Sequence, residues 1–162
     1  KVVYGQPYPG FESLSLRHFF LYNHYMKPFH LAIPVKDLKT SIEFYSEILG
    51  CSRGRSSKSW ADFNFFGHQL VCHVSPEKNN KVTNVVDGED VPVPHFGIIL
   101  DMQDFNKIAS RLQKKEIKFI IEPTLRFKGE PGEQKTMFFY DPSFNAIEIK
   151  AFNDSKEIFR VS

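Results

Sequence analysis

The sequence is short of several features that mark common classes of protein. Of its 162 residues only Cys51 and Cys72 are cysteines, too few for a disulfide framework and typical of reduced thiols in a cytoplasmic protein. No run approaches the roughly 18 consecutive apolar residues of a membrane-spanning helix. Lys and Arg (21) nearly balance Asp and Glu (19), which leaves a formal net charge of +2 from scattered basic residues. We therefore expect neither a nucleic-acid partner nor a membrane partner.

Aromatic residues are plentiful, because 17 positions are Phe and 41% of the chain is hydrophobic. A chain of this length and composition can bury the core of one globular domain. Strongly patterned sequence starts at Met26, so we predict a single domain over residues 26–152 and a polar tail over 153–162. Residues 1–25 precede it as an extension, explained equally by an arm, an organelle-targeting remnant or a sequence added for expression.

Within this domain the same order of elements occurs twice, over residues 28–75 and 94–152. Each copy begins with a proline-flanked strand that carries a histidine, and continues with an amphipathic helix and further strands. We predict strands at 28–35, 60–67, 68–74, 94–100, 117–125, 136–140 and 145–152, and helices over 38–49 and within 101–117. SRGRSSKS (52–59) and residues 76–94 are predicted as loops, the latter with room for a short strand.

This internal duplication, the helix DLKTSIEFYSEILG (37–50) and the closing FFYDPSFNAIEIK (138–150) resemble the vicinal oxygen chelate superfamily. That superfamily contains glyoxalase I, extradiol dioxygenases, fosfomycin-resistance transferases and methylmalonyl-CoA epimerase. The segment GHQLVCH (67–73) is also similar to small two-module proteins described as predicted extradiol dioxygenases. The resemblance implies an α+β fold in which two βαβββ modules form a curved mixed sheet around a metal-binding cavity.

The resemblance also implies a metal site with ligands from the first and last strands of the modules. The matching residues are His30, His95 and Glu148. Two imidazoles and one carboxylate suit Fe(II) and leave positions open for substrate and dioxygen, with Ni, Co, Mn or Zn as alternative metals. Because Ile147 and Ile149 flank Glu148, the acid is expected to point away from the core. Taken singly, a histidine among apolar residues is more often a hydrogen-bonded core residue than a ligand, and a single strand glutamate is usually solvated.

The closing strand of the first module decides between branches of the superfamily. Glyoxalases and epimerases resemble one another in having a fourth metal ligand on this strand, commonly Glu. Residues 63–74 of this chain contain no acid. Only Gln69, His68 and His73 could act there, as a fourth ligand or as a residue that orients one. Strand alternation places Gln69 and His73 on one face and His68 on the other. Three ligands with an open face favour an extradiol dioxygenase.

The extradiol signature is only partly matched. Asp141 and Pro142 fit it, but Phe138 takes its Tyr position, Phe144 takes its Gly position, and the upstream His is missing from residues 124–137. We predict His73 as acid and base and Tyr140 as a hydrogen-bond donor in their place, against the alternatives of a surface histidine and a packed tyrosine. We also expect Gly97, two residues after His95, to leave room beside the metal.

These observations lead to three hypotheses for function. The first is a metal-dependent dioxygenase, an oxidoreductase that uses Fe(II) and O₂ on a small vicinal diol. The second is a lyase or isomerase of glyoxalase or epimerase type. The third is a non-catalytic protein that binds a small molecule, as bleomycin-resistance members do. In each case the partner is a small molecule, and the sequence leaves open whether two chains pair as a homodimer.

Overall fold

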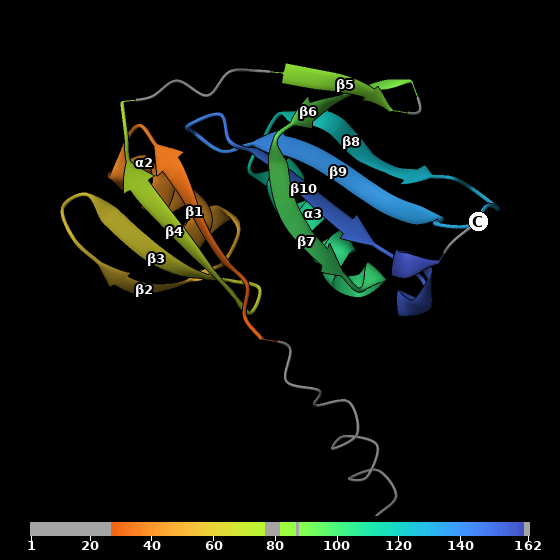
Figure 1. Ribbon diagram of the computed structural model, residues 1–162, viewed down its shortest axis with the longest axis horizontal. Helices are drawn as coiled ribbons and strands as arrows, with labels where there is room; N and C mark the ends of the chain where they lie inside the picture. Colours follow the sequence, from red (N-terminus) through yellow and green to blue (C-terminus); the bar gives the residue numbers. More distant parts are fainter. Residues whose placement is uncertain (1–26, 77–81, 87, 161–162) are drawn as a thin grey trace, which may run out of the picture.

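The computed structural model describes residues 27–76, 82–86 and 88–160. The predicted extension over residues 1–25 lies outside these ranges. Two four-stranded mixed sheets stand side by side, one from each module (Figure 1). Neither sheet closes into a barrel, since the first has the strand order β1-β4-β3-β2 and the second the order β7-β10-β9-β8. In each sheet the strand that comes first in the chain pairs in parallel with the strand that comes last, β1 with β4 and β7 with β10. The other neighbouring strands are antiparallel.

The first module contains β1 (His30–Val35), α2 (Leu38–Glu43), the π-helical turn η1 (Phe44–Ile48), β2 (Ser52–Ser56), β3 (Trp60–Phe65) and β4 (His68–Val74). The second contains β7 (His95–Leu100), α3 (Met102–Lys114), β8 (Phe119–Arg126), β9 (Gln134–Tyr140) and β10 (Ala146–Ala151), followed by the short 3-10 helix η2 (Ser155–Phe159). The predicted βαβββ order is therefore present in both modules.

Two segments predicted as loops contain strands. Residues 52–56 form the edge strand β2, whose side chains are all exposed, so that no apolar alternation marks it in the sequence. The connecting segment contains a hairpin of β5 (Val82–Val86) and β6 (Glu89–Val93). This hairpin lies on the second sheet, where Val91 packs with Ile121 and Phe138, and the Arg126 guanidinium donates to the Val86 carbonyl at 2.7 Å.

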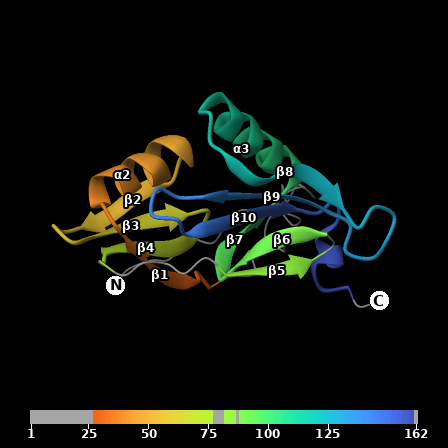
Figure 2. The ribbon, with the colours of Figure 1, turned by 90° about the horizontal axis from the view of Figure 1, so that it is seen from above.

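Each helix begins after an aspartate, and the segment predicted as one helix over 38–49 is α-helical to Glu43 and continues as the π-helical turn η1. The carboxylate of Asp37 accepts the Thr40 backbone N–H at 2.7 Å, and Asp101 does the same for Asp104 at the start of α3. On α3 the residues Phe105, Ile108, Ala109 and Leu112 form a buried stripe. The helices α2 and α3 cover the same side of the two sheets, and the β5–β6 hairpin lies on the opposite side (Figure 2). We call that opposite side the helix-free face of each sheet.

One hydrophobic core joins the two modules beneath the helices. Phe65 of β3 contacts Phe96 of β7, with ring centroids 5.7 Å apart. The hydroxyl of the fully buried Tyr45 donates to the Asp141 carboxylate at 3.0 Å. Cys51 and Cys72 belong to this core as free thiols, and burial raises the pKa of the Cys51 thiol to about 12. In the described residues, no helix is both long and apolar enough to span a membrane.

Because strand side chains alternate, core residues on one face place polar residues on the other. In β1, Ile33 and Val35 are buried, so His30 lies on the helix-free face of the first sheet. His95 has the same place in the second sheet, since it pairs with Ala146 just as His30 pairs with Gln69. The fold thus puts two equivalent histidines at the start of two equivalent strands.

Candidate metal-binding site

Glu148 is the acid of the candidate site, and its strand neighbours orient it. Ile147 and Ile149 are fully buried in the core, so the Glu148 side chain points to the helix-free face. There its Oε1 accepts the hydroxyl of Thr136 at 2.7 Å. Burial favours the neutral acid, but hydrogen bonds from His95, Thr136 and Lys150 outweigh it and lower the pKa of Glu148. Glu148 is therefore a buried carboxylate whose second oxygen, Oε2, faces cations.

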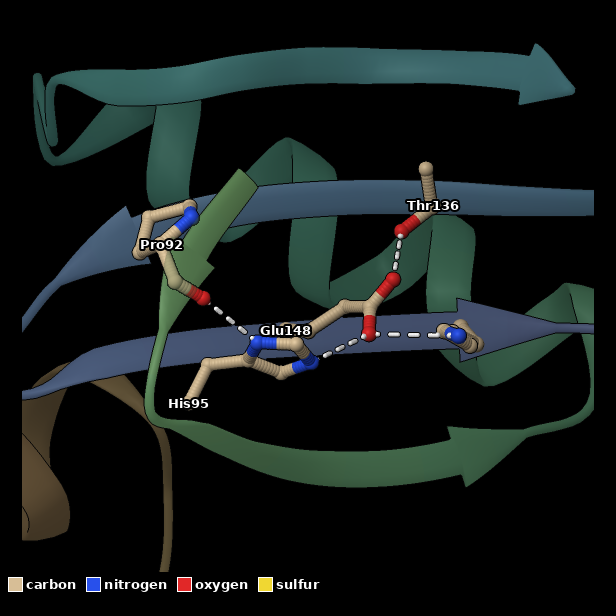
Figure 3. A network of polar contacts seen from close by, with 5 residues as sticks. Pro92, His95, Thr136 and Glu148 are labelled. Atoms are coloured by element: carbon tan, nitrogen blue, oxygen red, sulfur yellow. Dashed lines mark hydrogen bonds and ion pairs between the residues drawn. The ribbon is translucent and has the colours of Figure 1, made fainter. Parts of the chain in front are cut away.

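His95 points one ring nitrogen at that second oxygen. Its Nδ1 lies 2.7 Å from the carbonyl oxygen of Pro92, which can only accept, so Nδ1 carries a proton (Figure 3). Its Nε2 lies 3.2 Å from Glu148 Oε2. The hydrogen bond to Glu148 raises the pKa of His95, with burial opposing it and the Pro92 carbonyl adding to it. When His95 is neutral, Nε2 therefore holds the lone pair and is the nitrogen available to a metal.

Lys150 is a third member of this group that the sequence analysis did not identify. Its Nζ lies 3.2 Å from the same Glu148 Oε2 that His95 approaches. The alternation that places Glu148 on the helix-free face applies equally to Lys150, two residues later, so the signal was present in NAIEIKA. Two cationic groups thus converge on one carboxylate oxygen.

His30 is held by a separate chain of hydrogen bonds on the first sheet. Its Nδ1 lies 2.8 Å from Gln69 Oε1, and Gln69 Nε2 donates to the Asp62 carboxylate at 3.3 Å. Arg55 pairs with the same Asp62 oxygen at 3.5 Å. The amide nitrogen of Gln69 donates to Asp62, so the amide oxygen of Gln69 is the atom that faces His30. An amide oxygen can only accept, and Nδ1 of His30 therefore carries the proton. His30 therefore keeps Nε2 for another partner, and within the described residues no contact of this nitrogen is seen.

Within one chain the three predicted ligands do not meet. The part of the chain that the structure describes contains no group of three His, Cys, Asp or Glu side chains placed to hold a metal ion. His95 and Glu148 lie together on the second sheet, whereas His30 lies apart from them on the first. The prediction that all three bind one metal is not tested by this arrangement and stays a prediction.

The register also shows which residue of the first module corresponds to Glu148. Glu148 pairs with Gly97, two residues after His95, and Val71 pairs with Ala32, two residues after His30. A buried valine therefore occupies the position where a fourth ligand from the first module would stand.

The alternative candidates for that position lie elsewhere. Gln69 contacts His30 and orients it. His68 accepts the Phe29 backbone N–H through Nδ1 at 3.0 Å. His73 pairs with Pro34 and is exposed, four residues or roughly 13 Å along β4 from Gln69. Its predicted role as acid and base stays a prediction, but this distance separates it from the His30 ring.

Tyr140 lies closer to the candidate site. It pairs with Ala146, the residue that also pairs with His95, so both side chains emerge on the helix-free face. Tyr140 and His95 line a mainly apolar cavity of about 430 Å³, which Leu31, Ile33 and Pro34 of β1 also line. A small molecule in this cavity would contact His95.

The partial match to the extradiol signature has a structural explanation. Asp141 is buried and accepts the backbone N–H groups of Ser143 and Asn145, both at 2.8 Å, so it builds the turn before β10. Phe144, at the Gly position of the signature, has a φ of 66°, a left-handed conformation that glycine adopts more easily. These positions are requirements of the turn.

Gly97 has a structural role beside the one expected for it, which stays a prediction. A Cβ at this position would overlap the Glu148 carbonyl oxygen of the neighbouring strand. Gly97 is thus needed for the close approach of β7 to β10, and a larger residue would disturb the strand that carries Glu148.

Comparison with known proteins agrees with this architecture. The family model of the glyoxalase/bleomycin resistance protein/dioxygenase superfamily matches residues 27–149. A crystal structure of a glyoxalase/bleomycin resistance protein/dioxygenase from Alicyclobacillus acidocaldarius is 32% identical with a TM-score of 0.71, covering 83% of this chain and 97% of that one. The metallothiol transferase FosB of Staphylococcus epidermidis is 26% identical over 126 residues, which are 74% of this chain and 78% of the relative.

A more distant structure has the same fold. The fosfomycin resistance protein FosX from Listeria monocytogenes has a TM-score of 0.60 at 16% identity, covering 79% of this chain and 93% of that one.

Proposed function

The chain belongs to the glyoxalase/bleomycin resistance protein/dioxygenase superfamily, and on that premise we propose that it is a divalent-metal enzyme acting on a small oxygen-bearing substrate. One observation carries this proposal. Both His30 and His95 have Nδ1 held by an oxygen acceptor, and the Nε2 of His95 points at Glu148 Oε2, 3.2 Å away. Metal-binding histidines typically have this arrangement.

The donor set fits a divalent transition metal. Two neutral imidazoles and a carboxylate would hold Fe(II), Mn, Co, Ni or Zn and leave coordination positions for substrate. The part played by the chain itself is to hold these donors in place, with Thr136 fixing Oε1 of Glu148 and the Pro92 carbonyl fixing the His95 ring. The metal, when bound, would polarise a substrate oxygen as a Lewis acid.

The third ligand comes from a second copy of the chain. His30 is exposed on the helix-free face of the first sheet, with its free Nε2 available to another molecule. In a symmetric homodimer, the first sheet of one copy would face the second sheet of its partner, and each of two sites would combine His30 of one copy with His95 and Glu148 of the other. This arrangement accounts for ligands that lie apart within one chain.

The chemistry best supported is Lewis-acid activation for the addition of a nucleophile. The relative FosB is named a metallothiol transferase. On the described part of the second sheet's helix-free face, His95 is the imidazole near Glu148, and Phe138 stands where the extradiol signature has Tyr. Ring cleavage needs groups that move protons near the metal, so their replacement favours addition over oxygen activation.

The dioxygenase remains a second candidate because of one observation. Val71 occupies the position of a fourth ligand, which leaves a three-ligand site with the open face that iron oxygenases use. Parallel assays separate the two reactions. Protein loaded with Mn²⁺ or Fe²⁺ is mixed with fosfomycin and L-cysteine, and separately with catechol and O₂. Consumption of thiol with no uptake of O₂ supports the transferase, and O₂ uptake with ring-cleaved product supports the dioxygenase.

A mixing experiment tests the site shared between copies. His30→Ala and Glu148→Gln variants should each bind almost no metal alone, because each lacks one ligand at every site. Unfolded together and refolded, they should recover metal binding, since a mixed dimer has one site with all its ligands and one that lacks two. A site built within one chain predicts no recovery. Mixing His95→Ala with Glu148→Gln is the matched control, because these ligands share a copy and no dimer regains a site.

A further inference from the structure

Lys150 has no assigned role in the proposed metal site, yet its ammonium lies in it. Nζ is 3.2 Å from Glu148 Oε2, the oxygen that also receives His95 Nε2 at 3.2 Å. The side chain is 31% exposed, and β10 places it on the same face as Glu148. A long, half-exposed lysine can move its charged end at little cost.

A metal bound at Glu148 would repel the ammonium of Lys150. A divalent cation on Oε2 would stand beside the ammonium that now contacts the same atom, and like charges a few ångströms apart repel strongly where burial lowers the effective dielectric constant. The ammonium would lose its carboxylate partner and turn away from the metal. Lys150 would then be available to an anion bound beside the metal.

The charges of the loaded site indicate what that anion is. A divalent metal, one carboxylate and one ammonium leave about two positive charges once both histidines are neutral. A neutral diol would leave this charge uncompensated, whereas a dianionic group would balance it. The mainly apolar cavity beside His95 can take the rest of a small molecule.

We propose that Lys150 is the specificity-determining residue of this site, released from Glu148 by the metal to bind an anionic group of the substrate, such as a phosphate, phosphonate or carboxylate. The inference rests on the proposed function and names its substrate class. Comparison with the first module indicates that Lys150 is not needed for the strand itself. The equivalent position there is His73, so the duplicated fold forms without a lysine at this place.

Two affinities with opposite expected changes test this role. Mn²⁺ affinity is measured by titration of the full chain near neutral pH, and inorganic phosphate affinity by calorimetry on Mn²⁺-loaded protein. Lys150→Gln should bind Mn²⁺ about tenfold more tightly or better, because the competing cation is gone. The same variant should bind phosphate about tenfold more weakly or worse, because the anion loses its partner.

Two further variants isolate the position from the charge. Lys150→Arg keeps a cation and should retain phosphate binding. Lys135→Gln removes one positive charge from β9, where Lys135 contacts Asn106 of α3 at 3.2 Å on the helix-covered side, and should leave both affinities unchanged.

The outcomes distinguish this inference from the proposed function. If the wild-type chain binds no Mn²⁺, the proposed function fails and the role of Lys150 fails with it. If the wild type binds Mn²⁺ but Lys150→Gln does not change both affinities in opposite directions, the role of Lys150 alone is wrong. Equal changes in Lys135→Gln would also overturn it, since overall charge would then explain the result.

Discussion

The helix-free faces of the two sheets use the same framework for different local chemistry. Both begin with a histidine whose Nδ1 is held by an oxygen acceptor. On the second sheet the acid, Glu148, lies on the last strand and contacts His95 directly. On the first, the acid is Asp62 on β3, and it reaches His30 only through Gln69. The position equivalent to Asp62 in the second sheet is Phe138.

This difference indicates how a duplicated module divides one site into two parts. The second sheet supplies a carboxylate and an imidazole that contact each other, and both are available as ligands once His95 is neutral. The first sheet supplies a single oriented imidazole, His30. Its acid, Asp62, contacts Gln69 and not the imidazole, and pairs with Arg55 at 3.5 Å. A metal bound by both would take an anionic part from one module and a neutral part from the other. The predictions below test this division.

The largest expected effect is on the charged part. Glu148→Gln should weaken Mn²⁺ binding by about a hundredfold or more, because it removes the anionic ligand and keeps the shape of the side chain. Asp62→Asn is the matched control on the first sheet and should weaken binding far less. Titration of both variants, with circular dichroism to confirm folding, makes the measurement. Equal losses would mean that the two acids play equivalent parts.

The second prediction compares equivalent positions in the two first strands. Gly97→Ala should lower the free energy of unfolding by about 1–3 kcal/mol, because the added Cβ would overlap the Glu148 carbonyl oxygen. The equivalent position in β1 already carries Ala32, and Ala32→Gly should cost about 0.5–1 kcal/mol through chain entropy alone. Urea denaturation measures both. A neutral Gly97→Ala would show that the strands separate easily.

How far the sequence predicts this molecule depends on whether a feature is local. The caps at Asp37 and Asp101 and the buried stripe of α3 follow from local spacing, and the duplicated order points to His30 and His95. The edge strand β2 has no apolar side to reveal it. The link from Asp62 to His30 depends on the pairing of β3 with β4, which no local pattern shows.

The third prediction concerns that link. Gln69→Leu should weaken Mn²⁺ binding by about tenfold, because His30 loses the acceptor that fixes its ring and keeps Nε2 free. Gln69→Glu restores an oxygen acceptor for Nδ1 and should bind metal better than Gln69→Leu. If Gln69 were itself a ligand, the glutamate would instead bind more tightly than wild type. Comparing the three proteins in one titration separates orientation from ligation.

The smallest effect is a dependence of stability on pH in protein prepared without metal. The pKa of His95 is raised above its ordinary 6.5, first by its hydrogen bond to Glu148, so its contribution is complete below pH 6.5 and is lost as pH rises through the raised value. The pKa of Glu148 is lowered from 4.5 because its hydrogen bonds outweigh burial, so its contribution is present above pH 4.5 and is lost as pH falls through the lowered value. The stability difference between wild type and Glu148→Gln should therefore be greatest between pH 4.5 and 6.5. Thermal melts of both proteins across this range measure the difference. Asp62→Asn leaves the His95–Glu148 pair intact, so its melting temperature should vary with pH as that of the wild type does. A difference that stays constant with pH would mean that the pair does not form in solution, and the second sheet would then lack the charged half of the site.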